Sequence, residues 1–169
     1  MRAFGNAVLN VITGTLVLAS CGFTQSSSPA TVQKESRVTK HARGTFEVKL
    51  TPQPSDDRAN EDLGRMTIEK QLHGDLEGAG KGQMLTAGNS TGSGAYVAIE
   101  RITGTLEGRS GSFILQHRGI MTRGTPDLSI TVVPDSGTGQ LAGITGTFTI
   151  ILANGKHSYD FEYTLPQAQ

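Results

Sequence analysis

Residues 147–162, TFTIILANGKHSYDFE, contain the clearest β-hairpin of the chain and decide its fold class. Asn154-Gly155 stands between two apolar runs, and this dipeptide is the strongest short-range signal for a two-residue type I′ turn. Such a turn fixes the register, and the side chains that share one face of the pair are apolar. The pairs expected on this core face are Leu152 with His157, Ile150 with Tyr159, and Phe148 with Phe161.

Short alternating segments with turn signals between them continue this pattern over the chain from Gly44 onward. They are 44–50, 65–73, 76–87, 94–107, 110–122, 127–133, 140–153 and 156–165. No stretch of twelve or more residues carries a convincing helical period, and 22 glycines spread through the chain suit tight turns. We therefore expect an all-β fold, a closed antiparallel eight-stranded barrel whose interior is filled or holds one small ligand.

The N-terminal 20 residues have the features of a bacterial lipoprotein signal peptide. Arg2 supplies a positive start, and residues 7–19 are apolar but too short for a stable membrane span. Leu18-Ala19-Ser20-Cys21 resembles a lipobox, in which the cysteine is lipidated and the chain is cut before it. An ordinary secretory signal, cut nearby, is the alternative. Cys21 is the only cysteine, so no internal disulfide can form.

The expected organisation is a signal peptide over 1–20, a flexible tether over 21–42, which includes His41, and a barrel domain over 43–166. Lipidation at Cys21 would anchor the chain in the cell envelope, at the outer membrane if the source is Gram-negative, because Gly22 is not acidic. Lys and Arg balance Asp and Glu at fifteen each, which gives no nucleic-acid or polybasic membrane surface. The membrane is therefore a partner through the lipid alone.

Charged residues at inward-facing positions mark a candidate site. If Gly108-Arg109 forms a two-residue turn, Glu100 falls directly opposite His117 on an apolar face. Lys70 shares the inward parity of Met66, Ile68 and Leu72. A buried charge should be paired and hydrogen-bonded, so we expect Glu100 and His117 to form a unit that Lys70 and Tyr159 join. The pair either satisfies itself structurally or lines a pocket.

Other chemistry is not indicated by the residues. GAGKGQ at 78–83 has the glycines of a phosphate loop but lies within a strand rather than before a helix. A three-histidine metal site would need His73, His117 and His157 on one face, and His73 has the outward parity. We expect no metal and no cofactor.

A family resemblance is carried by four strings: GRMTIEKQLHGDLEG (64–78), GAYVAIERITGTLEGRSGSFILQHRGIM (94–121), LSITVVPDSGTGQLAGITG (128–146) and GKHSYDFEYTL (155–165). They resemble the bacterial domain of unknown function 3224. The resemblance implies a small barrel similar to that of allene oxide cyclase, in a fold group often seen as oligomers, with no established activity. The lipoprotein leader departs from the family pattern, and no catalytic motif of the plant cyclases maps onto this chain.

Three functional hypotheses follow. The first is a non-catalytic barrel that binds a small apolar or amphipathic ligand, with Glu100, His117 and Lys70 as polar contacts. Its candidate walls are Tyr96, Phe113, Phe148, Tyr159 and Phe161. The second is an isomerase or cyclase on a lipid-like substrate, with Glu100 and His117 as acid and base. The third is a homo-oligomeric interaction module with a filled core.

Overall fold

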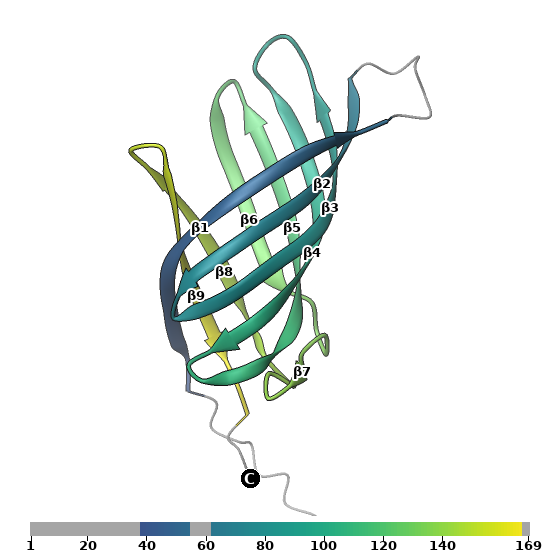
Figure 1. The fold of residues 1–169 in the computed structure, drawn as a ribbon. Coiled ribbons are helices and arrows are strands. Elements are labelled where there is room, and N and C mark those ends of the chain that lie inside the picture. Colours follow the sequence, from purple (N-terminus) through teal and green to yellow (C-terminus); the bar gives the residue numbers. More distant parts are fainter. Residues whose placement is uncertain (1–37, 55–61, 167–169) are drawn as a thin grey trace, which may run out of the picture. The chain divides into compact units, whose positions relative to one another are not determined.

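A computed structural model describes residues 38–54 and 62–166, and every regular element in these ranges is a β-strand (Figure 1). The strands are β1 (Lys40–Gln53), β2 (Leu63–Gly74), β3 (Leu76–Gly88), β4 (Gly94–Leu106), β5 (Arg109–Thr122), β6 (Thr125–Val132), β7 (Thr138–Gly139), β8 (Thr145–Ala153) and β9 (Lys156–Thr164). Within the described ranges, no helix is long and apolar enough to cross a membrane. The predicted signal peptide, Cys21 and the tether up to residue 37 lie outside these ranges.

Eight of the strands form the wall of a closed antiparallel barrel, which confirms the predicted fold. The order is β4-β3-β2-β1-β9-β8-β6-β5, and pairing of β4 with β5 closes the ring. Most neighbours pair along much of their length, but β6 and β8 meet at a single pair, Thr131 with Thr147. Beyond that pair the β5–β6 and β8–β9 hairpins separate toward one end of the barrel, at the top of Figure 1. We call this the open end.

The β8–β9 hairpin has the predicted register. Phe148 pairs with Phe161 and Ile150 with Tyr159. Asn154 and Gly155 both adopt positive φ, 52° and 73°, as a type I′ turn requires. The tip differs from the expectation, however: β6 pairs with β8 only at Thr147, and Leu152 is 66% exposed rather than buried in the core.

Two predicted boundaries were wrong. The predicted strand 140–153 begins only at Thr145, because the chain turns through residues 140–144, where Leu141 and Ile144 are fully buried against the core. Strand β1 begins at Lys40, within the segment assigned to the tether. Ala42 is fully buried, and this contact with the core is what makes the polar segment around it a strand.

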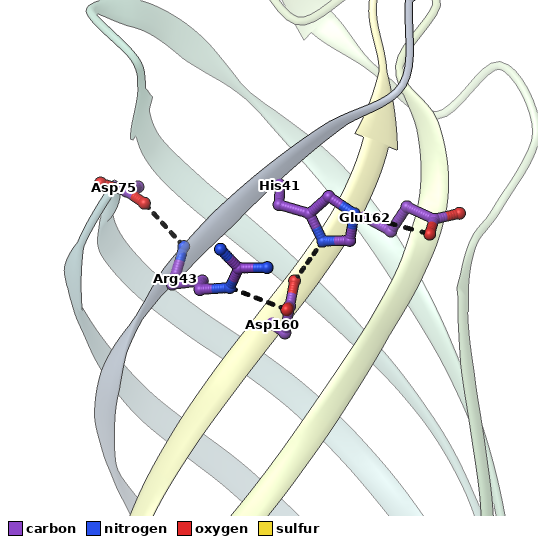
Figure 2. Close-up of polar contacts among 5 residues, drawn as sticks. All are labelled: His41, Arg43, Asp75, Asp160 and Glu162. Carbon is purple, nitrogen blue, oxygen red and sulfur yellow. Dashed lines mark hydrogen bonds and ion pairs between the residues drawn. The ribbon is translucent and has the colours of Figure 1, made fainter.

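Polar contacts on the outer surface attach the start of β1 to its neighbours (Figure 2). His41 Nδ1 and Arg43 Nε lie 2.7 and 2.8 Å from the two carboxylate oxygens of Asp160 on β9. The backbone N–H of Arg43 donates to Asp75, in the β2–β3 turn, at 2.8 Å. Burial holds the strand on one side and these ion pairs hold it on the other.

The interior is apolar and aromatic toward the end opposite the open end, which we call the closed end. Phe161 packs against three other rings, with centroids 5.3 to 5.7 Å away: Phe113, Phe148 and Tyr163. All four rings are at most 2% exposed. This half of the barrel is therefore filled.

Candidate functional site

Lys70, Glu100 and His117 form a buried charged cluster inside the barrel, on β2, β4 and β5. Lys70 Nζ donates to Glu100 Oε2 at 2.7 Å, and His117 Nε2 lies 3.2 Å from the same oxygen. The residues are 6%, 0% and 4% exposed, and they are the buried charged or polar side chains of the described core. The inward orientation predicted from parity places all three together.

The register of the β4–β5 hairpin differs from the prediction by two residues. The turn is Glu107-Gly108, with φ of 46° and 80°, so Leu106 pairs with Arg109. Glu107 adopts the left-handed conformation, and the turn therefore sits one residue earlier than Gly108-Arg109. Glu100 lies opposite Leu115, and His117 lies opposite Ala98. A shift by two keeps parity, so Glu100 and His117 remain on one face as diagonal neighbours.

Glycines on β3 make the room that the carboxylate of Glu100 needs. Gly82 pairs with Glu100, and Gly80 pairs with Lys70. A Cβ added to Gly80 would lie 2.1 Å from Glu100 Oε1, so the carboxylate rests directly on this glycine. The glycines of GAGKGQ thus have a structural purpose, because those at inward positions allow Glu100 to reach across β3 toward Lys70. The alternation of glycine with larger residues over 78–83 was the sequence signal for this space, and the prediction made from the sequence did not use it.

The surroundings keep Glu100 ionised. Burial by itself would raise the pKa of the Glu100 carboxyl, but the imidazole of His117 and the charge of Lys70 outweigh it, so the pKa lies below its usual value. The ammonium of Lys70 is held in turn by Glu100 and by two aromatic faces, with Nζ 4.9 Å from the ring centroid of Phe46 and 5.8 Å from that of Phe148.

The cluster is incompletely satisfied by the described part of the chain. Glu100 Oε1 and His117 Nε2 are fully buried and have no aligned hydrogen-bond partner there, although Nε2 lies close to the other carboxylate oxygen. Buried polar atoms normally have a hydrogen-bond partner. Leaving one without a partner costs roughly 1–3 kcal/mol, and more when the atom belongs to a charged group. These two atoms therefore have hydrogen-bonding capacity that the described part of the chain does not use.

Two predicted site residues belong to the packed core instead. Tyr159 was expected to join the charged cluster, but its hydroxyl lies 3.0 Å from the backbone N of Leu76, which donates to it. The same hydroxyl contacts the carbonyls of His73 and Leu76 at 3.3 and 3.2 Å. It thus fastens β9 to the β2–β3 turn. Phe113 is fully buried and stacks on Phe161, so it contributes packing rather than a cavity wall.

An apolar cavity of about 510 Å³ lies at the open end, and Tyr96 is the predicted wall residue that lines it. The ring of Tyr96 covers Gly119, where an added Cβ would lie 2.2 Å from the ring. Burial, and the nearby charge of Glu100, raise the pKa of the Tyr96 phenol. The other lining residues include Thr86, Ile120, Met121, Leu128, Leu152 and His157. We call this the upper cavity.

The charged cluster lies next to the upper cavity along the strands. Tyr96 pairs with Gly119, and the next inward-facing pair toward the closed end is Ala98 with His117. On the neighbouring strands β2, β3 and β4, a small apolar core cluster is formed by Ile68, Met84 and Ala98. Sequence reasoning missed most of the cavity because its lining comes from strands that meet only when the barrel closes.

A second hollow, of about 450 Å³, lies at the closed end and has a different character. Lys40, Glu107, Arg109 and Tyr163 contribute to it, and Lys40 Nζ forms an ion pair with Glu107 at 2.6 Å. Arg109 Nη1 donates to the carbonyl of Pro166 at 3.4 Å, so each charged side chain of this hollow has a partner within the chain. His73 is on the outer surface as its parity predicted, between Glu47 and Glu77.

Comparison with known proteins identifies a family without an assigned activity. No curated protein matches the chain. A solved structure from Shewanella oneidensis, described as a protein with unknown function from the DUF3224 family, is 44% identical, with a TM-score of 0.73. The similarity covers 78% of this chain and 100% of that one. Residues 42–163 match the family described as "Protein of unknown function (DUF3224)". This chain therefore belongs to the DUF3224 family.

Proposed function

We propose that this protein is a binding barrel that holds a small amphipathic molecule in the upper cavity, and that a lipid on Cys21 anchors it to an envelope membrane. The observation that carries the binding proposal is the position of the buried cluster of Lys70, Glu100 and His117 beside an apolar cavity. Ligand sites commonly combine apolar walls with a few placed polar groups, and this arrangement has both.

The cost of the cluster supports a role in binding. Burying charges is expensive, and apolar residues of similar volume are often as stable or more so at such positions. The closed half of the same barrel is filled with aromatic rings and contains no such group among its described residues. The charges lie between the filled half, where Lys70 Nζ is 5.8 Å from the ring centroid of Phe148, and the upper cavity. This position beside the cavity fits recognition of a polar group better than stability.

The charge state of the cluster favours binding over acid–base catalysis. A general base or acid works best with a pKa near the working pH, which for a carboxyl group means a raised pKa. The pKa of Glu100 is instead lowered from its usual value. Lys70 Nζ donates to Glu100 and lies over the rings of Phe46 and Phe148, so contacts within the chain already occupy it. The isomerase hypothesis therefore draws no support from the carboxyl of Glu100.

The binding proposal is tested with the uncharged fluorophore Nile red and a pair of variants on β8. Leu152 lines the upper cavity, whereas its neighbour Ile151 has the opposite parity; both are exposed, at 66% and 45%. Leu152→Asp should weaken dye binding by about tenfold, the equivalent of ~1.4 kcal/mol. Ile151→Asp should leave it unchanged. A folded wild-type chain that takes up no dye would refute the proposal.

The anchoring proposal rests on Leu18-Ala19-Ser20-Cys21 at the end of the apolar segment. Each buried methylene of an acyl chain contributes about 0.8 kcal/mol, so two or more chains hold a protein firmly. Cys21→Ala should abolish labelling by a fatty-acid analogue and release the protein from the membrane fraction, whereas Ser20→Ala should do neither. A wild-type chain that never labels would show the anchoring proposal to be wrong.

A further inference from the structure

We infer that the ligand of the upper cavity is an amphipathic alcohol, whose hydroxyl bonds to Glu100 Oε1 and His117 Nε2. The inference rests on the proposed function and specifies its ligand class. It starts from the two buried polar atoms that lack an aligned partner in the described chain, Glu100 Oε1 and His117 Nε2. Both belong to side chains that are at least nine-tenths buried.

The hydrogen-bonding inventory of these atoms selects the group. A carboxylate oxygen only accepts, so Oε1 requires a donor. His117 Nε2 either donates or accepts according to its tautomer. A hydroxyl offers one donor and two acceptor lone pairs, so it can donate to Oε1 and accept from Nε2–H when the imidazole carries its proton on Nε2. An ether or ester oxygen lacks the donor and would leave Oε1 unpaired.

Charge balance excludes the ionic alternatives. Lys70 and Glu100 already neutralise each other at 2.7 Å. A ligand carboxylate would place a second anion beside Glu100, and a ligand ammonium would place a second cation beside Lys70. Like charges in a buried site are costly, and a neutral hydroxyl adds neither charge. The cluster therefore discriminates against fatty acids and amines that have the same tail.

The distance along β5 shows how the ligand would lie. His117 is two residues from Gly119, which lines the upper cavity, and a strand rises roughly 3.4 Å per residue. A hydroxyl must therefore extend about 7 Å beyond the level of Gly119, with its tail remaining among Met121, Leu128 and Leu152. The ring of Tyr96 lies over Gly119 on this route, so the inference requires this ring to turn aside when the ligand enters.

Three probes with matched tails test the inference by displacing Nile red from the full chain. Decanol donates and accepts, decyl methyl ether only accepts, and decanoate is an anion at about pH 8. Decanol should displace the dye at a concentration about tenfold lower than either of the others, because only decanol donates to a buried charged group. Equal potency of decanol and the ether, or tighter binding of decanoate, would overturn the inference.

A double variant assigns the selectivity to the cluster. Lys70→Met with Glu100→Gln removes both buried charges together and should bring the decanol-to-ether ratio close to one. The matched control is Lys49→Met with Glu69→Gln, an exposed cross-strand pair on the outer face of β1 and β2, and it should keep the ratio. Persistence of the ratio in the first variant would overturn the inference, and if that variant does not fold, the three probes on the wild type decide.

The two proposals fail in different ways. If Nile red does not bind to the folded wild-type chain, the proposed function is wrong. If Nile red binds and is displaced by all three probes alike, the binding function stands and the assignment of an alcohol is wrong.

Discussion

The two halves of this barrel interior are built from the same strands and yet serve different purposes. At the closed end, the rings of Phe113, Phe148, Phe161 and Tyr163 pack against one another, and each residue is at most 2% exposed. Toward the open end, the same strands carry a charged cluster, small residues such as Ala98 and Gly119, and an apolar cavity. The closed half thus supplies stability, and this allows the open half to bury charges and to keep a cavity.

The pairing of strands supports this division. β6 and β8 are joined by one pair near the middle of the wall, and the hairpins that extend from them diverge toward the open end (Figure 1). At the closed end, Leu141 and Ile144 from the segment before β8 are fully buried against the core. The wall is thus tight where the core is filled and looser where the cavity lies.

The largest expected effect comes from removing an aromatic ring in the closed half. Phe161→Ala should lower the free energy of unfolding by about 3–5 kcal/mol, since Phe161 is fully buried and contacts three other rings. Tyr96→Ala in the open half should cost clearly less, because its ring is half-buried at the cavity. Chemical denaturation measures both, and equal losses would contradict the division into two halves.

A smaller effect is expected at the glycine that supports Glu100. Gly80→Ala would place a Cβ 2.1 Å from Glu100 Oε1, which forces the carboxylate away from Lys70 and should cost about 1–3 kcal/mol. Gly88→Ala, at the other end of β3, is the control because nothing lies within 4 Å of the added Cβ. Thermal unfolding of the two variants tests the claim, which fails if their stabilities are alike.

The smallest effect concerns acid stability of the open half. The pKa of Glu100 is held below the ordinary 4.5, so its contribution to stability is complete above that pH and is lost as the pH falls through the folded-state value. Wild-type stability should therefore fall more steeply below about pH 4.5 than that of the Lys70→Met, Glu100→Gln variant. Parallel curves of stability against pH for the two proteins would show that protonation of Glu100 does not affect stability.

Much of the fold and part of the site followed from local patterns. The alternation of apolar and polar residues predicted eight barrel strands, and Asn154-Gly155 predicted the register that β8 and β9 adopt. Parity alone placed Lys70, Glu100 and His117 inside. The predicted cross-strand partner of Glu100 was wrong. Glu107 was expected to end the strand, but it adopts the left-handed conformation and is the first residue of the turn.

The sequence by itself determined which side chains face inward, because successive residues of a strand point to opposite faces whatever the strand pairs with. Only the tertiary structure decided which inward residues meet. Pairing of β2 and β4 on either side of β3 brings Lys70 to Glu100 across the glycines of β3. Closure of the barrel brings Leu152 to the cavity that Tyr96 and Leu128 line. It also engages the hydroxyl of Tyr159 at the β2–β3 turn, 83 residues away along the chain from Leu76. Local backbone geometry sets direction, whereas contact depends on how the sheet curls around and meets itself.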